Sequence, residues 1–212
     1  AARRELAEDL FNLAGAIADR FDDPEAAVAA FRESIQTYDA LHAEDPTVEA
    51  PLDSGRAQLG AAEVDAGRTG PVTPAESAVL ARWMMRRGHD VRAADAYVGM
   101  LAEPKYRDDL GHRYRFLAAC FAMRAIAAGA PDVASRRATA LALLEEDVRA
   151  RRSRIEAATR AKADATDDAT RQALAQEVAG HTDVLEEIRA KNADLAPLRG
   201  EPAFLFRTDE MY

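Results

Sequence analysis

Apolar residues recur along most of this chain at intervals of three and four, the spacing that places them on one face of an α-helix. Prolines and glycines interrupt the pattern where helices are expected to begin and end. Few segments rich in Val, Ile or Thr have a period of two, so we expect an all-α fold without strands. The predicted helices span roughly 4–21, 24–43, 48–66, 75–87, 91–103, 107–128, 132–163 and 168–191, followed by a short segment near 201–206.

The connections between these predicted helices are mostly a few residues long. Short connections force consecutive helices to run antiparallel. The exception is GRTGPVTP at residues 67–74, which we interpret as a flexible loop. The sequence therefore predicts a series of antiparallel helical hairpins.

A common arrangement of small and large residues recurs in three of these hairpins. It places large and small residues in alternation on the first helix, and a small residue four positions before a large one on the second. The first copy consists of Phe11, Ala14, Gly15, Ala18, Ala27, Phe31 and Ser34. The second consists of Ser77, Leu80, Ala81, Met84, Gly88, Ala93, Tyr97 and Met100. The third and weakest consists of Ala118, Phe121, Ala122, Ala125, Gly129, Ala134, Ala138 and Leu141.

This arrangement resembles the tetratricopeptide repeat (TPR), a helix–turn–helix unit that stacks into a solenoid. The resemblance implies a TPR-like α-solenoid of antiparallel hairpins that binds other proteins. The register is irregular, because the 48–66 helix also resembles the first helix of a repeat through Leu59 and Gly60. The 75–87 helix could then pair with 48–66 or with 91–103, and the sequence does not decide between these pairings.

Two segments carry a narrower resemblance. NLAGAIADRFDDPEAAVAAFRESIQTYDALHAEDP is similar to the extended TPR units that follow the catalytic domain of some bacterial Ser/Thr protein kinases, and NADLAPLRGEPAF resembles their closing segment. The resemblance implies a bacterial protein. The interruption at 67–74 and the long helices before the closing segment depart from that family. The chain itself has no kinase Gly-rich loop, HRD or DFG triplet.

The last two predicted helices are too long for an ordinary TPR. Apolar residues spaced by three, four and seven form facing stripes, which suggests an antiparallel, coiled-coil-like hairpin. The stripes contain Leu141, Leu144, Val148, Ile155 and Ala158 on one helix and Leu174, Val178, His181, Leu185 and Ile188 on the other. We therefore expect degenerate repeats over 1–131, a terminal repeat helix extended into a long C-terminal helical hairpin over 132–195, and a capping segment over 196–212.

Composition narrows the class of function. Alanine, the strongest helix former, makes up close to a quarter of the chain. The net charge of −9 argues against a nucleic-acid partner, which needs a basic surface. No apolar run is long enough for a membrane span. Cys120 is the one cysteine, so we expect no internal disulfide, a buried thiol and a reducing, cytoplasmic location. The chain begins without Met inside a helical pattern, which we interpret as a fragment.

Candidate catalytic and metal-binding residues are sparse. The glycines of the 67–74 loop lack the GK[ST] of a phosphate-binding loop. Asp108 with His112, and Glu177 with His181, are i,i+4 pairs that offer only two ligands each. No serine sits in a nucleophile elbow. We therefore expect no enzyme, no cofactor and no metal site.

Two sets of residues are candidates for binding a partner. If first helices line a solenoid groove, the first and second copies place Asn12, Asp19, Arg20, Arg82 and Arg86 in it. Arg82 and Arg86 lie one turn apart, so both could reach a carboxylate of a bound peptide. The second set is a basic cluster that could be a docking patch or a charged face balanced by nearby acids: Arg149, Arg151, Arg152 and Arg154.

These observations favour a non-catalytic protein–protein interaction scaffold or regulatory module whose partner is another protein or peptide. The alternative is a structural subunit that self-associates or joins a larger complex through its long hairpin. The two hypotheses differ in the surface they use: the groove for the scaffold and the hairpin for the subunit.

Overall fold

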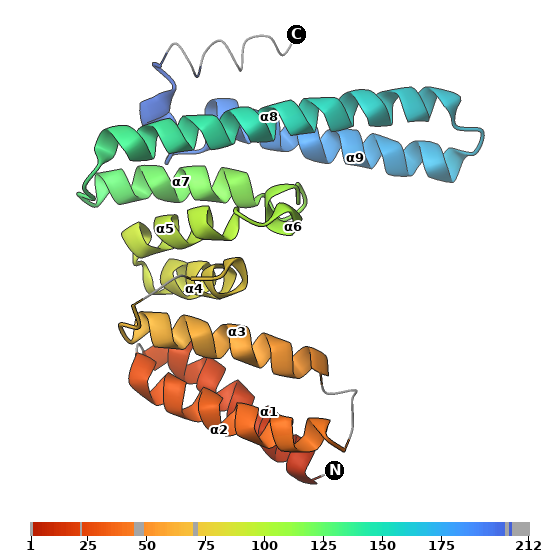
Figure 1. The fold of residues 1–212 in the computed structure, drawn as a ribbon. Helices are drawn as coiled ribbons and strands as arrows, with labels where there is room; N and C mark the ends of the chain where they lie inside the picture. Colours follow the sequence, from red (N-terminus) through yellow and green to blue (C-terminus); the bar gives the residue numbers. More distant parts are fainter. Residues whose placement is uncertain (1, 22, 45–48, 70–71, 202–203, 205–212) are drawn as a thin grey trace. The chain divides into compact units, whose positions relative to one another are not determined.

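A computed structural model describes residues 2–21, 23–44, 49–69, 72–201 and 204 of the chain (Figure 1). Within these ranges every regular element is helical, which confirms the all-α prediction. The chain divides into two compact units, Ala1–Glu103 and Pro104–Tyr212. The sequence placed the end of the repeats at residue 131, whereas α7 (Tyr114–Ala127) belongs to the second unit because it packs against α8 (Val133–Asp164).

The helices of the first unit follow the predicted order and lie within a few residues of the predicted ends. They are α1 (Ala2–Ala16), the π-helical turn η1 (Ile17–Phe21), α2 (Pro24–His42), α3 (Glu49–Asp65), α4 (Pro74–Arg87) and α5 (Asp90–Met100). The second unit contains α6 (Pro104–Arg107), α7, α8, α9 (Asp168–Glu186), η3 (Glu187–Lys191) and the 3-10 turn η4 (Ala196–Leu198).

Helix ends follow local chemistry. Thr73 and Glu76 form a reciprocal capping box at the start of α4: the Thr73 amide donates to Glu76 Oε2 at 2.7 Å, and the Glu76 amide donates to Thr73 Oγ1 at 3.2 Å. The loop at 67–74 thus ends in a helix cap. Gly88 ends α4 with φ of 74°, a left-handed conformation that favours glycine.

The start of α7 differs from the prediction, which placed it near residue 107. The carboxylate of Asp109 accepts a hydrogen bond from the His112 amide at 3.0 Å and contacts its ring Nδ1 at 2.6 Å. Arg113 then adopts a left-handed φ of 58° before the helix begins. This side-chain-capped turn competes with helix and delays α7 to Tyr114. It also pairs His112 with Asp109 rather than with Asp108.

The α1–α2 hairpin uses its small residues as the sequence predicts. Ala14, Ala18 and Ala27 are buried, so the two helices approach closely. Phe31 fills the gap: its ring lies edge-on to Phe11 at 5.9 Å and stacks on Trp83 of α4 at 6.1 Å. The buried α1–α2 contact also includes a hydrogen bond from Ser34 to the carbonyl of Ala7, at 3.0 Å.

Helix α4 packs against both α3 and α5, and more extensively against α5. Both pairings considered from the sequence are therefore present. Two glycines make the close contacts possible: a Cβ at Gly60 of α3 would overlap the Glu76 carboxylate, and one at Gly99 of α5 would lie 2.8 Å from Ser77 Oγ. Because Gly60 and Gly99 have no side chains, α4 can pack closely against both α3 and α5.

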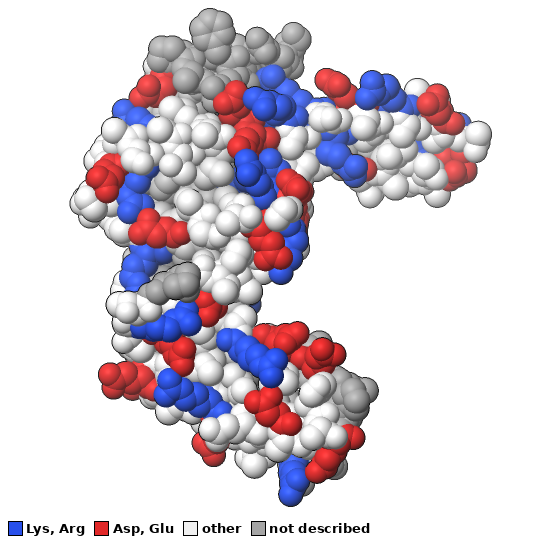
Figure 2. Space-filling view, viewed as in Figure 1, with Lys and Arg blue, Asp and Glu red and all other residues white. Residues whose placement is uncertain are grey.

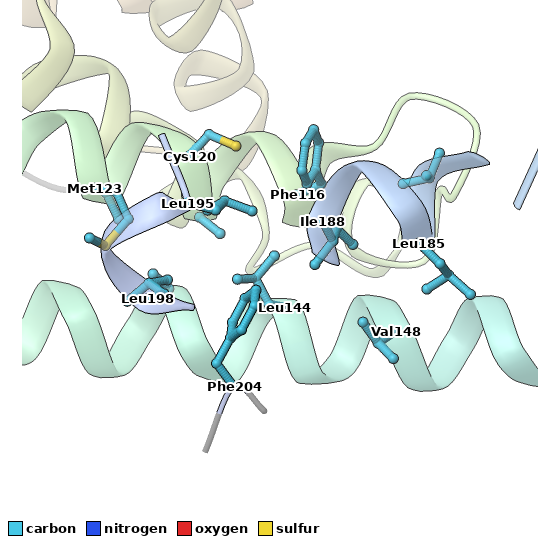
Figure 3. Close-up of a cluster of buried hydrophobic side chains, with 14 residues drawn as sticks. Phe116, Cys120, Met123, Leu144, Val148, Leu185, Ile188, Leu195, Leu198 and Phe204 are labelled. Carbon is cyan, nitrogen blue, oxygen red and sulfur yellow. The ribbon is translucent and has the colours of Figure 1, made fainter. Parts of the chain in front are cut away.

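The second unit is held by one apolar cluster between α7, α8, the end of α9 and the chain that follows it (Figure 3). Phe116 and Met123 of α7 face Leu144 of α8, and the closing segment contributes Leu195 and Leu198, both fully buried. The DLAPLRG stretch is therefore part of the core. Of the short segment expected near 201–206, residues 202–203 and 205–206 lie outside the described residues.

The third motif copy keeps its first helix but not its second. Ala118, Phe121 and Ala122 are buried on α7, whereas Ala134 and Ala138 of α8 are exposed. Helix α8 buries a different set instead: Ala140, Leu144, Asp147, Val148, Arg151 and Ala158. The prediction that Ala134 and Ala138 are buried on α8 is therefore wrong, whereas Leu141, the last residue of the third copy, is half-buried against the apolar cluster.

Helices α8 and α9 form the predicted long antiparallel hairpin and extend past the end of α7 (Figure 1). We call residues 152–183 the hairpin arm. Beyond Arg151, Ala158 is the buried residue of α8, and Ile155, Leu174 and Val178 are half-buried. The arm thus has a thin seam made by two helices alone.

Candidate binding surfaces

The predicted groove residues lie in one unit, and the structure brings two of them into contact. Turn η1 packs against α4, and there the Arg86 guanidinium pairs with the carboxylate of Asp19. Asn12, Arg20 and Arg82 are exposed, and no hydrogen bond or ion pair is found for them among the described residues. Arg86 is already paired with Asp19, which leaves Arg20 and Arg82 as the predicted groove arginines that can meet a partner's carboxylate.

A buried ion-pair network that no sequence pattern predicted lies at the α3–α4–α5 junction. The carboxylate of Asp65, with its side chain 3% exposed, accepts from Arg87 and from Arg92, both at 2.6 Å. Arg87 also donates to the carbonyl of Ala18. We call Asp65, Arg87 and Arg92 the junction network. Arg87 and Arg92 lie 22 and 27 residues after Asp65, so no local sequence pattern indicates this network.

The basic cluster at 149–154 does not form one continuous surface. Arg149 pairs with Glu145 at 3.0 Å, and Arg154 pairs with Glu177 of α9 at 2.8 Å. Basic and acidic groups are interspersed on the visible face of the arm (Figure 2). Arg151 is 1% exposed and cannot contribute to a docking surface. The arrangement of the cluster therefore fits a charged face that is balanced by nearby acids. The docking role of Arg149, Arg152 and Arg154 stays a prediction.

Arg151 instead organises a buried network at the base of the arm. Its guanidinium donates to Asp147 at 2.7 Å and to the carbonyl of Leu110 at 3.0 Å. Arg115 of α7 lies 3.9 Å from the same Asp147 carboxylate. We call Arg115, Asp147, Arg151 and His181 the base network. The sequence contains a pattern that indicates this burial. Arg151 continues the spacing of Leu144 and Val148 in the apolar stripe, and Asp147 lies four residues before Arg151.

His181 completes this network on the hairpin seam, where the sequence placed it. Its Nδ1 lies 3.2 Å from Arg151 Nη1. An arginine has no acceptor, so Nδ1 must accept and the imidazole is neutral. Burial first, and then the positive charge of Arg151, lower the pKa of His181 below its ordinary value of 6.5. The nearby Glu177 carboxylate, at 3.9 Å from Nε2, opposes that shift only in part.

Chemically reactive groups do not converge in the described residues. No group of three His, Cys, Asp or Glu side chains that could hold a metal ion occurs there. Burial raises the pKa of the Cys120 thiol to about 12, with smaller contributions from Asp194 and Glu187, so the thiol stays protonated and unreactive. None of the described helices has the length and hydropathy needed to cross a bilayer.

Comparison of the chain with family models, with curated proteins and with solved structures finds no match in any of the three. The surfaces described above are therefore interpreted from their own geometry.

Proposed function

We propose that the chain is a non-catalytic protein-binding module of the TPR type, which presents a groove to a peptide segment of another protein. The observation that carries this proposal is the burial of the motif positions in the α1–α2 and α4–α5 hairpins. Ala27 and Phe31 in the first, and Ala93 and Tyr97 in the second, are each at most 5% exposed. Such small-to-aromatic complementarity is what repeat proteins use to stack hairpins and leave an open surface for a partner.

The exposed guanidinium of Arg82 suggests the chemistry of that partner. An arginine side chain binds a carboxylate through two parallel N–H···O bonds, and at an exposed site this interaction gives specificity. Arg82 and Arg86 lie one turn apart on α4, with Arg86 held by Asp19. The expected ligand is therefore a peptide with an acidic residue.

Selection from a displayed peptide library tests this function. The wild-type chain is expected to enrich acidic peptides, and Arg82→Glu is expected to lose them through charge repulsion. Arg171→Glu is the control, because Arg171 is an exposed helical arginine in the other unit and belongs to neither predicted binding set. Failure to enrich any peptide, or equal binding by Arg82→Glu, would overturn the proposal.

The second candidate function is self-assembly through the hairpin arm. The arm carries a bias of charge rather than a full separation: residues 152–164 of α8 include four basic and two acidic residues, and residues 168–183 of α9 include three acidic residues and one basic residue. Two arms packed with α8 against α9 of the partner copy would match these charges. Light scattering after size-exclusion chromatography distinguishes the two functions, since a mass of 23 kDa at all concentrations contradicts assembly.

A further inference from the structure

A cavity of about 300 Å³ lies between α3, α4 and α5 of the first unit. Its walls are apolar, with Val64 from α3 and Leu80 and Met84 from α4. Pockets for small ligands start at about this volume, so the cavity suits one side chain or a fragment of similar size. None of the residues predicted for the groove lines it.

Small residues on α5 keep the cavity open. Ala96 and Gly99 line the side opposite the wall of α4. A Cβ at Gly99 would approach Ser77 Oγ to 2.8 Å, closer than such contacts occur, so glycine here lets the Ser77 hydroxyl lie against α5. The cavity is therefore a result of residue choice at two adjacent turns of one helix.

The polar group inside the cavity is the hydroxyl of Ser77. The residue is 3% exposed and lines the cavity, and no hydrogen bond from this hydroxyl is found among the described residues. The hydroxyl opens onto the cavity, where water can bond to it, so a ligand atom that displaces this water must donate or accept the same hydrogen bond. An occupant with an apolar body and a polar tip fits this requirement.

The rim carries one basic and one acidic side chain. Arg92 and Asp95 lie on α5 and line the cavity. Asp65 pairs with one terminal nitrogen of Arg92 at 2.6 Å, and the side chain of Arg92 is 47% exposed, so its other N–H groups can reach a ligand. A positive and a negative group together favour a neutral ligand over an ion. A peptide backbone, with its C=O and N–H, is such a ligand.

We propose that this cavity binds the side chain of a tyrosine in a peptide of the partner protein. The ring packs between Leu80, Met84 and Ala96, and the phenol hydroxyl hydrogen-bonds to Ser77. The backbone carbonyl beside the tyrosine accepts a hydrogen bond from Arg92. Aromatic residues with a polar tip are common anchors at interfaces because they bury a large apolar body and satisfy one hydrogen bond. The site is separate from Arg82, so it adds an anchor to the proposed peptide-binding function on which it rests.

The test uses N-acetyl-L-tyrosinamide and N-acetyl-L-phenylalaninamide as probes, titrated into the full chain and followed by ¹H–¹⁵N NMR. The tyrosine probe is expected to shift the amides of Ser77, Ala96 and Gly99. It should bind about three- to tenfold more tightly than the phenylalanine probe, the worth of one hydrogen bond. Ser77→Ala should make the two probes equal, because it removes the hydroxyl and keeps the apolar wall.

A second variant fills the cavity without touching the hydroxyl. Ala96→Leu is expected to abolish binding of both probes, whereas Val98→Leu, a 43% exposed position on the same helix, should leave it unchanged. Absence of shifts at Ser77, Ala96 and Gly99, or a tyrosine preference that survives Ser77→Ala, would overturn the proposal. The probes need no partner protein, so their failure leaves the peptide selection with Arg82 intact, and failure of that selection leaves this site intact.

Discussion

The two units each bury an aspartate between two arginines, yet the two networks differ in how far water is excluded. In the base network Asp147 and Arg151 are both 1% exposed, and Arg151 makes further contacts to His181 and to a backbone carbonyl. In the junction network Asp65 is buried, but the side chain of Arg92 is 47% exposed. The same residue types therefore serve as a sealed structural centre in one unit and as a support for a cavity rim in the other.

The difference in burial between the two networks should change how much each contributes to stability. Breaking a fully buried ion pair leaves a charge that water cannot reach, whereas a half-exposed arginine can regain solvent. The chain offers a separate probe for each unit, because Trp83 is its one tryptophan and Cys120 its one cysteine. Trp83 fluorescence reports the first unit, and thiol reactivity of the buried Cys120 reports the second.

The largest effect is expected for Asp147→Ala. The change leaves Arg151 and Arg115 buried without their carboxylate, so the free energy of unfolding of the second unit should fall by about 3–5 kcal/mol. Denaturant titration monitored by Cys120 reactivity measures this loss. Trp83 fluorescence should report an unchanged first unit, and a loss below about 1 kcal/mol would mean that the network is not a structural centre.

A smaller loss is expected for Asp65→Ala in the first unit. Arg87 is buried and loses its carboxylate but keeps its contact with the carbonyl of Ala18, and Arg92 turns to solvent. One buried arginine rather than two is therefore left without a carboxylate, and the free energy of unfolding should fall by about 2 kcal/mol. Trp83 fluorescence in denaturant is the measurement. A loss as large as that of Asp147→Ala would contradict the difference drawn between the two networks.

The two networks also show where sequence reasoning succeeds and fails. Helix ends were predicted well because Pro24, Pro74 and Gly88 act locally, through a fixed φ or a left-handed cap. Burial of charged residues depends on partners distant in the chain. Arg151 is a surface residue by type, and only its spacing from Leu144 indicates that it points inward.

The candidate sites show the same difference between features that are local in the sequence and features that depend on distant partners. The groove prediction named Asp19 and Arg86, and the structure shows these two side chains in an ion pair, whereas the groove itself stays a prediction. The cavity beside Ser77 could not be predicted, since it depends on how α3, α4 and α5 approach one another. Gly99 carried the only sequence signal, an isolated glycine inside a helix, which marks a close contact.

A pH effect sharpens the comparison, because the base network contains an imidazole and the junction network does not. The folded-state pKa of His181 is lowered, so the unfolded chain binds its proton more readily. Stability of the second unit should therefore fall as pH drops from about 6.5 toward the folded-state pKa of His181, and fall no further from this residue below it. Arg151, Arg154, Glu177 and Asp147 are the charged groups around the ring.

Denaturant midpoints of the second unit between pH 7.5 and pH 5 measure this dependence. His181→Asn is the matched control, because the Asn oxygen can accept from Arg151 and does not titrate. Its stability should be flat over this range. A wild-type curve that is equally flat would mean that the Arg151 contact is compatible with a charged imidazole.

The smallest effect is expected for Arg149→Ala, two residues before Arg151 in the same basic cluster. The side chain of Arg149 is 74% exposed, and its pair with Glu145 is one helical turn long. Exposed pairs of this kind contribute little because water screens the charges, so the free energy of unfolding should change by about 0.5 kcal/mol or less. Paired with Asp147→Ala, which removes the carboxylate of Arg151, this variant compares a surface arginine with a buried one on the same helix. A loss from Arg149→Ala above about 1 kcal/mol would show that position in the cluster, rather than burial, sets the contribution of these arginines.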